Sequence, residues 1–406
     1  MNPSENNTGR PIWARPELFP SAPDANWGYN HRWHGLTAVA SEVELVQLLR
    51  DDVNESIGLV WTPGQTNLEV PEAIPSLHEA LKQSRSVAAR RQLDHAAGQL
   101  KFGLLLFVGF QVYTGWEIYQ AIPDAGPLVL LRVLWDSMAP VMGFLMLLMF
   151  FATPWYDSRK RYHEVKGWTV ETMREAAELA RFETWLEWQK IYATKVLMGV
   201  IAFAGALQII SGKTKAAALM LGDAERWRLL TAPLLHGHAA HFFMNALGLL
   251  YLGKRIEALA RWPHVVMVFV FSAWLGGEAS LLFSLAEVPP GAEPQYALGA
   301  SGGIMGMLGF LLVFEWRHAR LVPRSSRRRL LFALIATGVI GLVGIRFIDN
   351  AAHAGGLLAG MLYALIVFPR SESAMRPSAS LSDKVAAAAC FAVLGYGLWL
   401  CFRAMM

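Results

Sequence analysis

Long apolar runs limit the possible folds of this sequence more than any other feature. Nine of them, most close to 20 residues long, follow one another between residues 102 and 402. A helix of about 20 apolar residues can cross the hydrocarbon core of a bilayer, where the backbone finds no other hydrogen-bond partners. The runs lie at 102–123, 137–156, 196–212, 232–253, 262–284, 296–314, 330–345, 350–369 and 385–402. We therefore predict an all-α polytopic membrane protein.

The composition agrees with a membrane location. Of the 406 residues, 54% are hydrophobic and 17% are charged, which is too little charge for a soluble protein of this size. The net charge of +4 is spread over short clusters, which argues against nucleic acid as a partner. The two cysteines, Cys390 and Cys401, both fall in the last run, so neither a disulfide framework nor a thiolate metal site is expected.

Clusters of Lys and Arg set the expected orientation, because such residues stay on the cytoplasmic side. The clusters lie two crossings apart, as alternation of the spans demands. They comprise Arg159, Lys160, Arg161 and Lys166; Lys254, Arg255 and Arg261; and Arg317, Arg320, Arg324, Arg327, Arg328 and Arg329. The amino terminus, which lacks the features of a secretory signal, is then predicted to be cytoplasmic.

These features divide the chain into five predicted segments. The first, 1–98, is polar and rich in proline, and we expect a small cytoplasmic α+β domain there. Within it, Ser41 with Glu44 and Ser76 with Glu79 fit capping boxes, and 57–62 reads as a strand. The other segments are two extra transmembrane helices (99–157), a cytoplasmic amphipathic linker helix (158–195), a core of six transmembrane helices (196–369), and a linker with a carboxyl-terminal transmembrane helix (370–406).

Three groups of polar residues interrupt the apolar runs, where burying them is costly. They are His236, His238, His241 and Asn245 in the fourth run, Ser301 at the start of the sixth, and Asn350 with His353 at the start of the eighth. The sixth and eighth runs begin at the same membrane face. Ser301 and His353 are therefore expected at similar depth.

Small residues offer a way to bring this serine and histidine together. His353, Gly356 and Gly360 share one helix face, and Gly302 and Gly306 follow Ser301 with the same spacing. Packing of the two faces would place an imidazole base beside a serine hydroxyl, which needs such a base to act as a nucleophile.

A developing oxyanion would also need donors. The amide of Asn245, the free N–H of Ser301 at a helix start, and His241 one turn before Asn245 are the candidates.

These residues resemble the motifs of the rhomboid intramembrane serine proteases. The run from Gly299 to Gly303 resembles the family's Gly-x-Ser-Gly nucleophile motif, and Ala352-His353 with its two following glycines resembles the motif of the sixth core helix. One position departs from the pattern, since Met305 stands where the family often has an aromatic residue packed against the base.

Three further motifs are similar to those of the family. Trp227-Arg228 matches a pair in the first outer loop, the stretch from His236 to Asn245 matches a His-x4-His-x3-Asn helix, and Glu257 matches an acidic residue at the cytoplasmic end of the second core helix. The resemblance covers about 196–369.

The resemblance implies a six-helix bundle around a water-filled cavity and an intramembrane serine endopeptidase that acts on transmembrane protein substrates. Ser301 would be the nucleophile and His353 the base, with Asn245 and His241 at the oxyanion and no metal or cofactor. Supporting residues would be His236, Gly299, Asn350, Trp227, Arg228 and Glu257. The membrane is predicted to be a bacterial inner membrane.

Other interpretations stay open at this point. The Gly-Ala-Ser-Gly-Gly run could serve only for helix contact. The three histidines lack the acidic ligands of a typical metal site. An inactive rhomboid-like protein that binds or escorts membrane proteins is the main alternative, although such relatives usually lack the serine or the histidine. A transporter would explain buried polar groups but not their spacing.

Overall fold

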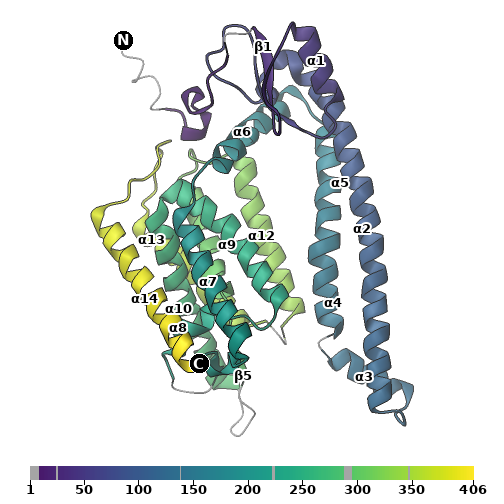
Figure 1. Ribbon diagram of the computed structural model, residues 1–406, viewed down its shortest axis with the longest axis vertical. Coiled ribbons are helices and arrows are strands. Elements are labelled where there is room, and N and C mark those ends of the chain that lie inside the picture. Colours follow the sequence, from purple (N-terminus) through teal and green to yellow (C-terminus); the bar gives the residue numbers. More distant parts are fainter. Residues whose placement is uncertain (1–8, 24–25, 138, 222–224, 288–294, 346–347) are drawn as a thin grey trace. The chain divides into compact units, whose positions relative to one another are not determined.

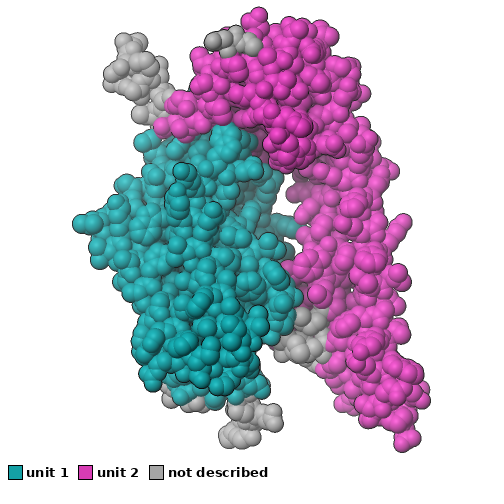
Figure 2. Space-filling model, viewed as in Figure 1, with its two compact units in different colours: residues 1–14, 182–337, 349–406 teal, residues 15–181, 338–348 magenta. Residues whose placement is uncertain are grey.

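The computed structural model of the protein describes residues 9–23, 26–137, 139–221, 225–287, 295–345 and 348–406. The chain forms two compact units, coloured separately in Figure 2. We call residues 1–14, 182–337 and 349–406 the site unit, and residues 15–181 and 338–348 the amino-terminal unit.

A small antiparallel sheet lies in the amino-terminal unit. Its strands β1 (Trp27–His31), β2 (Gly35–Val39) and β3 (Ile57–Trp61) are ordered β2-β1-β3. The predicted strand at 57–62 is therefore confirmed. Helix α1 (Glu42–Asp51) begins at Ser41, whose hydroxyl accepts the Glu44 N–H at 3.3 Å, as the first capping box predicts.

The second predicted capping box is wrong. Helix α2 (His78–Ala121) has Leu77 as its N-cap, and no side chain caps it. Pro75 begins a 3-10 turn, Pro75–Leu77, that runs directly into α2, so Ser76 lies inside helical backbone and not ahead of it.

The apolar part of the amino-terminal unit is helical. Helix α2 packs against α4 and α5, and the cluster of Leu45, Leu49, Val60 and Leu81 forms a core near the sheet. The elements that follow α2 are α3 (Pro127–Asp136), α4 (Ala139–Leu147), a π-helical turn (Leu148–Ala152) and α5 (Thr153–Lys166). Helix α6 (Val170–Glu187) belongs to this unit up to residue 181 and to the site unit from residue 182.

The site unit is a bundle of helices with two short strands (Figure 1). Its carboxyl-terminal helix, drawn in yellow, stands at one edge of the bundle. In chain order the elements are α7 (Tyr192–Ser211), β4 (Leu219–Leu221), α8 (Arg228–Thr231), the 3-10 turn η7 (Ala232–Leu234), α9 (Ala239–Ala260), α10 (Trp262–Glu287), β5 (Gln295–Ala297), α11 (Ser301–Arg317), α12 (Arg324–Val343), α13 (Asn350–Val367) and α14 (Leu381–Met405).

Six described stretches are long and apolar enough to cross a membrane. They are Pro75–Ala121, Ala139–Lys166, Tyr192–Ser211, Trp262–Phe283, Asn350–Val367 and Leu381–Met405. The remaining predicted runs fall on α9, α11 and α12, which carry charges or are shorter. The chain is thus an integral, multi-pass and mostly helical membrane protein with a small strand-containing region, and the predicted fold class is confirmed in these respects.

Helix α11 is the most deeply buried helix around the site. Eleven of its 17 residues are buried, and Phe310 and Phe314 are fully enclosed. A helix that is apolar on all sides belongs in the interior of a bundle. Its one acidic residue, Glu315, forms a buried ion pair with Arg255 of α9, and the Arg255 Nη2–Glu315 Oε2 distance is 2.8 Å.

Glycines bring the backbones of α11 and α13 into direct contact. A Cβ placed on Gly360 would lie 1.8 Å from the Gly306 carbonyl oxygen, and one on Gly356 would lie 2.1 Å from that of Gly302. No side chain can occupy either space. The predicted contact between the two small-residue faces is therefore confirmed.

Candidate active site

Ser301 and His353 lie at the same end of this glycine contact. Ser301 is the first residue of α11, and His353 lies in the first turn of α13. A Cβ on Gly302, next to Ser301, would be 3.5 Å from the carbonyl oxygen of Ala352, next to His353. Between these two described side chains there is no direct hydrogen bond, and such bonds often tighten only when substrate binds.

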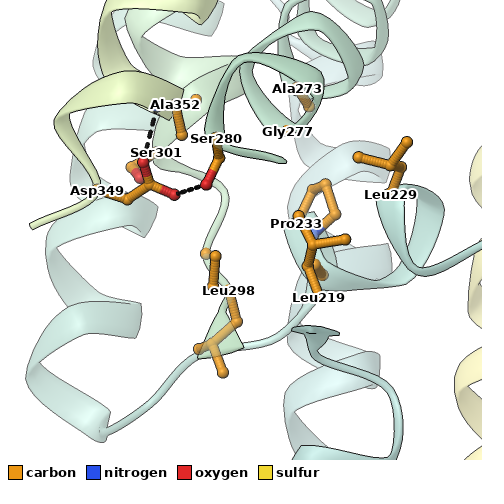
Figure 3. A pocket seen from close by; sticks show the side chains of 14 residues that line it. Leu219, Leu229, Pro233, Ala273, Gly277, Ser280, Leu298, Ser301, Asp349 and Ala352 are labelled. Atoms are coloured by element: carbon orange, nitrogen blue, oxygen red, sulfur yellow. Dashed lines mark hydrogen bonds between the residues drawn. The ribbon is translucent and has the colours of Figure 1, made fainter. Parts of the chain in front are cut away.

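Ser301 lines a small cavity at the start of α11 (Figure 3). The volume is about 50 Å³, which is enough for water. One wall is apolar and includes Leu229, Pro233 and Leu298, whereas Ser280 and Asp349 are polar members of the lining. The cavity therefore has room for water beside the Ser301 hydroxyl.

Gly299 allows two side chains of α9 to approach the segment before Ser301. Its φ angle is +132°, a conformation that L side chains rarely adopt. A Cβ at this position would lie 2.6 Å from His241 Cε1, 2.9 Å from His241 Nε2 and 3.7 Å from Asn245 Nδ2. The structure thus brings His241 and Asn245 together beside the backbone that leads into α11.

The amide of Asn245 is buried and available. Within the described part of the chain, Nδ2 has no hydrogen-bond partner. Buried donors without partners are uncommon in folded proteins, so this one needs an explanation. A donor left free for a developing negative charge is one that acyl-transfer chemistry would use.

His236 lies near these residues. The sequence motif predicted that it belongs to the same helix as His241, but it lies before that helix. Helix α9 begins only at Ala239, because the backbone is extended at Leu235, after the 3-10 turn, and again at His238. The His236 ring packs edge-on against His241, with ring centroids 5.2 Å apart. Its backbone N–H donates to Gln208 Oε1 of α7 at 3.0 Å, a partner that no motif indicated.

His238 is the N-cap of α9. Its side chain is exposed, and Nδ1 accepts the His241 N–H at 3.2 Å. Within the described residues, no group of three or more His, Cys, Asp and Glu side chains is arranged to hold a metal ion.

Trp227 and Arg228 organise the loop that precedes the site. The Arg228 guanidinium is buried and donates through Nη1 to the carbonyl oxygens of Ala216 and Ala218 at 2.7 and 2.9 Å. It also lies 4.7 Å from the Trp227 ring centroid, within cation–π range. Their contacts hold chain segments together and do not reach Ser301.

Glu257 also acts at a distance from the serine. This buried carboxylate of α9 accepts the backbone N–H groups of Ala193 and Thr194, both at 3.0 Å, and the Thr194 hydroxyl at 2.8 Å. Those N–H groups belong to the first turn of α7, where backbone N–H groups have no acceptor within their own helix. Glu257 thus caps a helix other than the one that carries it.

Asp349, and not Asn350, is the polar residue of this segment that lines the cavity. Asn350 is the first residue of α13, and Asp349 is its N-cap. The Asp349 carboxylate accepts the Ala352 N–H at 2.8 Å and the Ser280 hydroxyl at 2.5 Å (Figure 3). The preference of Asp for N-caps could have drawn attention to it in the sequence.

Part of the chain matches a known protein family. Residues 223–370 match the family model described as the Rhomboid domain. The chain contains a rhomboid domain. All predicted site residues, from Trp227 to His353, lie within the rhomboid domain, whereas α2 to α5 and α14 lie outside it.

The relatives of this rhomboid chain include proteins with and without stated protease activity. RHOMBOID-like protein 4 of Arabidopsis thaliana is 30% identical over 149 residues, which is 37% of this chain and 36% of the relative. Rhomboid protease GluP of Bacillus subtilis (strain 168) is 30% identical over 145 residues, or 36% of this chain and 27% of the relative.

A human relative is named as inactive. Inactive rhomboid protein 2 of Homo sapiens is 28% identical over 179 residues, which is 43% of this chain and 20% of the relative. The chain thus spans well under half the length of these three relatives. Family membership alone does not distinguish protease from inactive homologue, so the function is argued from the site.

Proposed function

We propose that this protein is an intramembrane serine endopeptidase with Ser301 as nucleophile and His353 as base. The observation that carries the proposal is the glycine contact of α11 and α13, which sets the serine and histidine at one end of the same helix pair. The cavity beside Ser301 and the unpartnered amide of Asn245 support it.

The proposed reaction proceeds through an acyl-enzyme. His353 takes the proton of the Ser301 hydroxyl as the oxygen attacks the carbonyl carbon of the scissile peptide bond. The resulting oxyanion is stabilised by the Asn245 amide, the Ser301 N–H and His241. His353 then gives its proton to the leaving amine as the C–N bond breaks, and a water molecule in the cavity hydrolyses the ester with the same histidine as base.

The dimensions of the cavity favour a locally unwound substrate. A volume of about 50 Å³ admits water or a small side chain but not a helix. A transmembrane substrate must therefore expose an extended segment to Ser301, which is least costly near glycine or other helix-weakening residues. We propose substrates of this class, single-span proteins with small residues near the cleaved bond.

The decisive test compares wild-type protein with Ser301→Ala and His353→Ala in liposomes that contain a single-span substrate. Cleavage by the wild type alone is the expected result. Equal cleavage by all three proteins would show a contaminating protease and refute the assignment. Retained substrate binding without cleavage by the wild type would favour the alternative of an inactive binding or escort protein.

We further propose that the amino-terminal segment 1–98 faces the cytoplasm of a bacterial inner membrane. The support is the alternation of basic clusters along the chain. Single cysteines at the exposed positions Thr66, Arg328 and Lys213, in a protein without its native cysteines, test the orientation. Labelling of the first two from one side and of the third from the other is expected, and labelling of all three from one side would contradict it.

A further inference from the structure

The first turn of α13 is fixed by a residue outside the recognised motifs. Asp349 accepts the Ala352 N–H through its carboxylate at 2.8 Å and the His353 N–H through its main-chain carbonyl at 3.1 Å. The side chain and the main chain of Asp349 thus both accept hydrogen bonds from the turn that carries His353.

The same carboxylate joins α13 to α10. Asp349 Oδ2 accepts the hydroxyl of Ser280, which is 3% exposed, at 2.5 Å. Both residues line the cavity into which Ser301 opens, as Figure 3 shows. The bond is short, part-buried and charge-assisted, which places it among the stronger hydrogen bonds in proteins.

A second hydrogen bond joins α10 and α13 far from Ser301, where His264 Nδ1 lies 2.9 Å from the Tyr363 hydroxyl. Near Ser301, the other described contacts of α13 are close glycine contacts. On α10, a Cβ at Gly276 would lie 2.7 Å from the Ala352 carbonyl oxygen, and α13 meets α11 through Gly356 and Gly302. Glycine contacts allow close approach, but they do not oppose a small slide or rotation of one helix along another. A hydrogen bond does, because its strength falls steeply with distance and angle.

We propose that Asp349, held by Ser280, is a positioning residue that sets the place of the His353 imidazole relative to the Ser301 hydroxyl. The inference rests on the proposed peptidase function, since the geometry matters only if His353 takes the proton of Ser301. Neither Asp349 nor Ser280 exchanges a proton with substrate in this scheme.

The experiment uses the full-length protein in liposomes and compares wild type with Asp349→Ala, Asp349→Asn, Ser280→Ala and Ser380→Ala. Ser380 is a matched control, because its hydroxyl caps α14 by accepting the Asp383 N–H at 3.1 Å, outside the site. For each protein we would measure kcat and KM for a single-span substrate, the folded fraction, and thermal unfolding.

Asp349→Ala is expected to lower kcat of the folded enzyme roughly 10- to 100-fold with little change in KM, since small misplacements of reacting groups have effects of this size. Ser280→Ala should act in the same direction but less strongly. Asp349→Asn should restore most of kcat, because an amide can still accept the Ala352 N–H and bond Ser280. Ser380→Ala should lower the unfolding temperature and leave kcat unchanged.

Two results would overturn the inference and leave the peptidase function standing. One is wild-type kcat in Asp349→Ala and Ser280→Ala while Ser301→Ala is inactive. The other is a loss in Asp349→Ala that disappears once activity is divided by the folded fraction, which would show a structural role alone.

If the wild type does not cleave, the peptidase proposal fails, and covalent labelling of Ser301 by a fluorophosphonate then decides the inference. Slower labelling of Asp349→Ala and Ser280→Ala than of the wild type would support positioning. Equal labelling of all three, or no labelling of any, would overturn it.

Discussion

At the scale of single residues, Gly299 is a position where both the backbone conformation and the neighbouring side chains exclude a larger residue. Replacing it with alanine would force an L side chain into a φ of +132° and set its Cβ 2.6 Å from His241 Cε1. We expect Gly299→Ala to lower the free energy of unfolding by about 1–3 kcal/mol, the usual cost of such backbone strain, and to displace His241.

The measurement is thermal unfolding together with substrate cleavage. Gly395→Ala in α14 is the matched control, because a Cβ there meets nothing within 4 Å. It should leave stability equal or slightly raised, since alanine favours helix. Equal unfolding temperatures for Gly299→Ala and wild type would contradict the prediction.

Asn245 allows a sharper test of the chemistry. If its unpartnered amide stabilises the oxyanion, Asn245→Ala should reduce kcat roughly 100-fold or more with a small effect on KM. The control is Asn54→Ala, the same substitution at an exposed position outside the site, which should leave kcat unchanged. A rise in KM at unchanged kcat would instead assign Asn245 to ground-state binding.

At the scale of elements, the closest approach in the site unit is between α11 and α13. A Cβ on Gly360 would be 1.8 Å from the backbone of Gly306, so Gly360→Ala must push the two helices apart. We expect cleavage to be lost and the unfolding temperature to fall. Gly205→Ala in α7, with nothing within 4 Å, serves as control, and normal cleavage by Gly360→Ala would refute the role of this contact.

Glu257 makes the start of α7 dependent on α9. Glu257→Gln would place an amide NH2 among three donors, from the Ala193 N–H, the Thr194 N–H and the Thr194 hydroxyl. The expected loss in the free energy of unfolding is about 1–3 kcal/mol, the cost of a buried donor without an acceptor. Hydrogen exchange at Ala193 and Thr194 would detect local opening there, and unchanged protection would count against the cap.

At the scale of the whole molecule, we expect a response to pH within the amino-terminal unit. Asp52, in the amino-terminal unit, is buried, which by itself raises the pKa of its carboxyl. Hydrogen bonds from the Ser56 hydroxyl and from the Ser56 and Ile57 N–H groups, with the charge of Arg85, outweigh burial and lower the pKa below the ordinary value.

A folded-state pKa below the unfolded value stabilises the folded unit above the unfolded pKa, about 3.9 for Asp. That stability is lost as pH falls through the lowered pKa. We therefore expect amide protection at Ser56 and Ile57 to be lower in Asp52→Asn than in wild type at pH 7, and the difference to shrink below about pH 4. A difference independent of pH would contradict the linkage.

Much of this architecture follows from local features of the chain. The apolar runs predicted the helices because length and hydropathy decide membrane crossing without knowledge of neighbours. The glycines that follow Ser301 and His353 predicted a close helix contact in the same way. His236 shows the limit of such patterns. Its spacing from His241 suggested one helix, but the backbone is extended at Leu235 and His238, so α9 begins after His236.

The sequence by itself therefore determined the membrane class, the helices, the face on which α11 and α13 meet, and the presence of a rhomboid domain. Only the tertiary structure decided which distant groups became partners: Glu257 with the start of α7, Gln208 with His236, and Ser280 with Asp349. The physical reason is that hydropathy and helix faces are set by residues close in sequence. A directional hydrogen bond between helices depends instead on their relative translation and rotation, which no single helix contains.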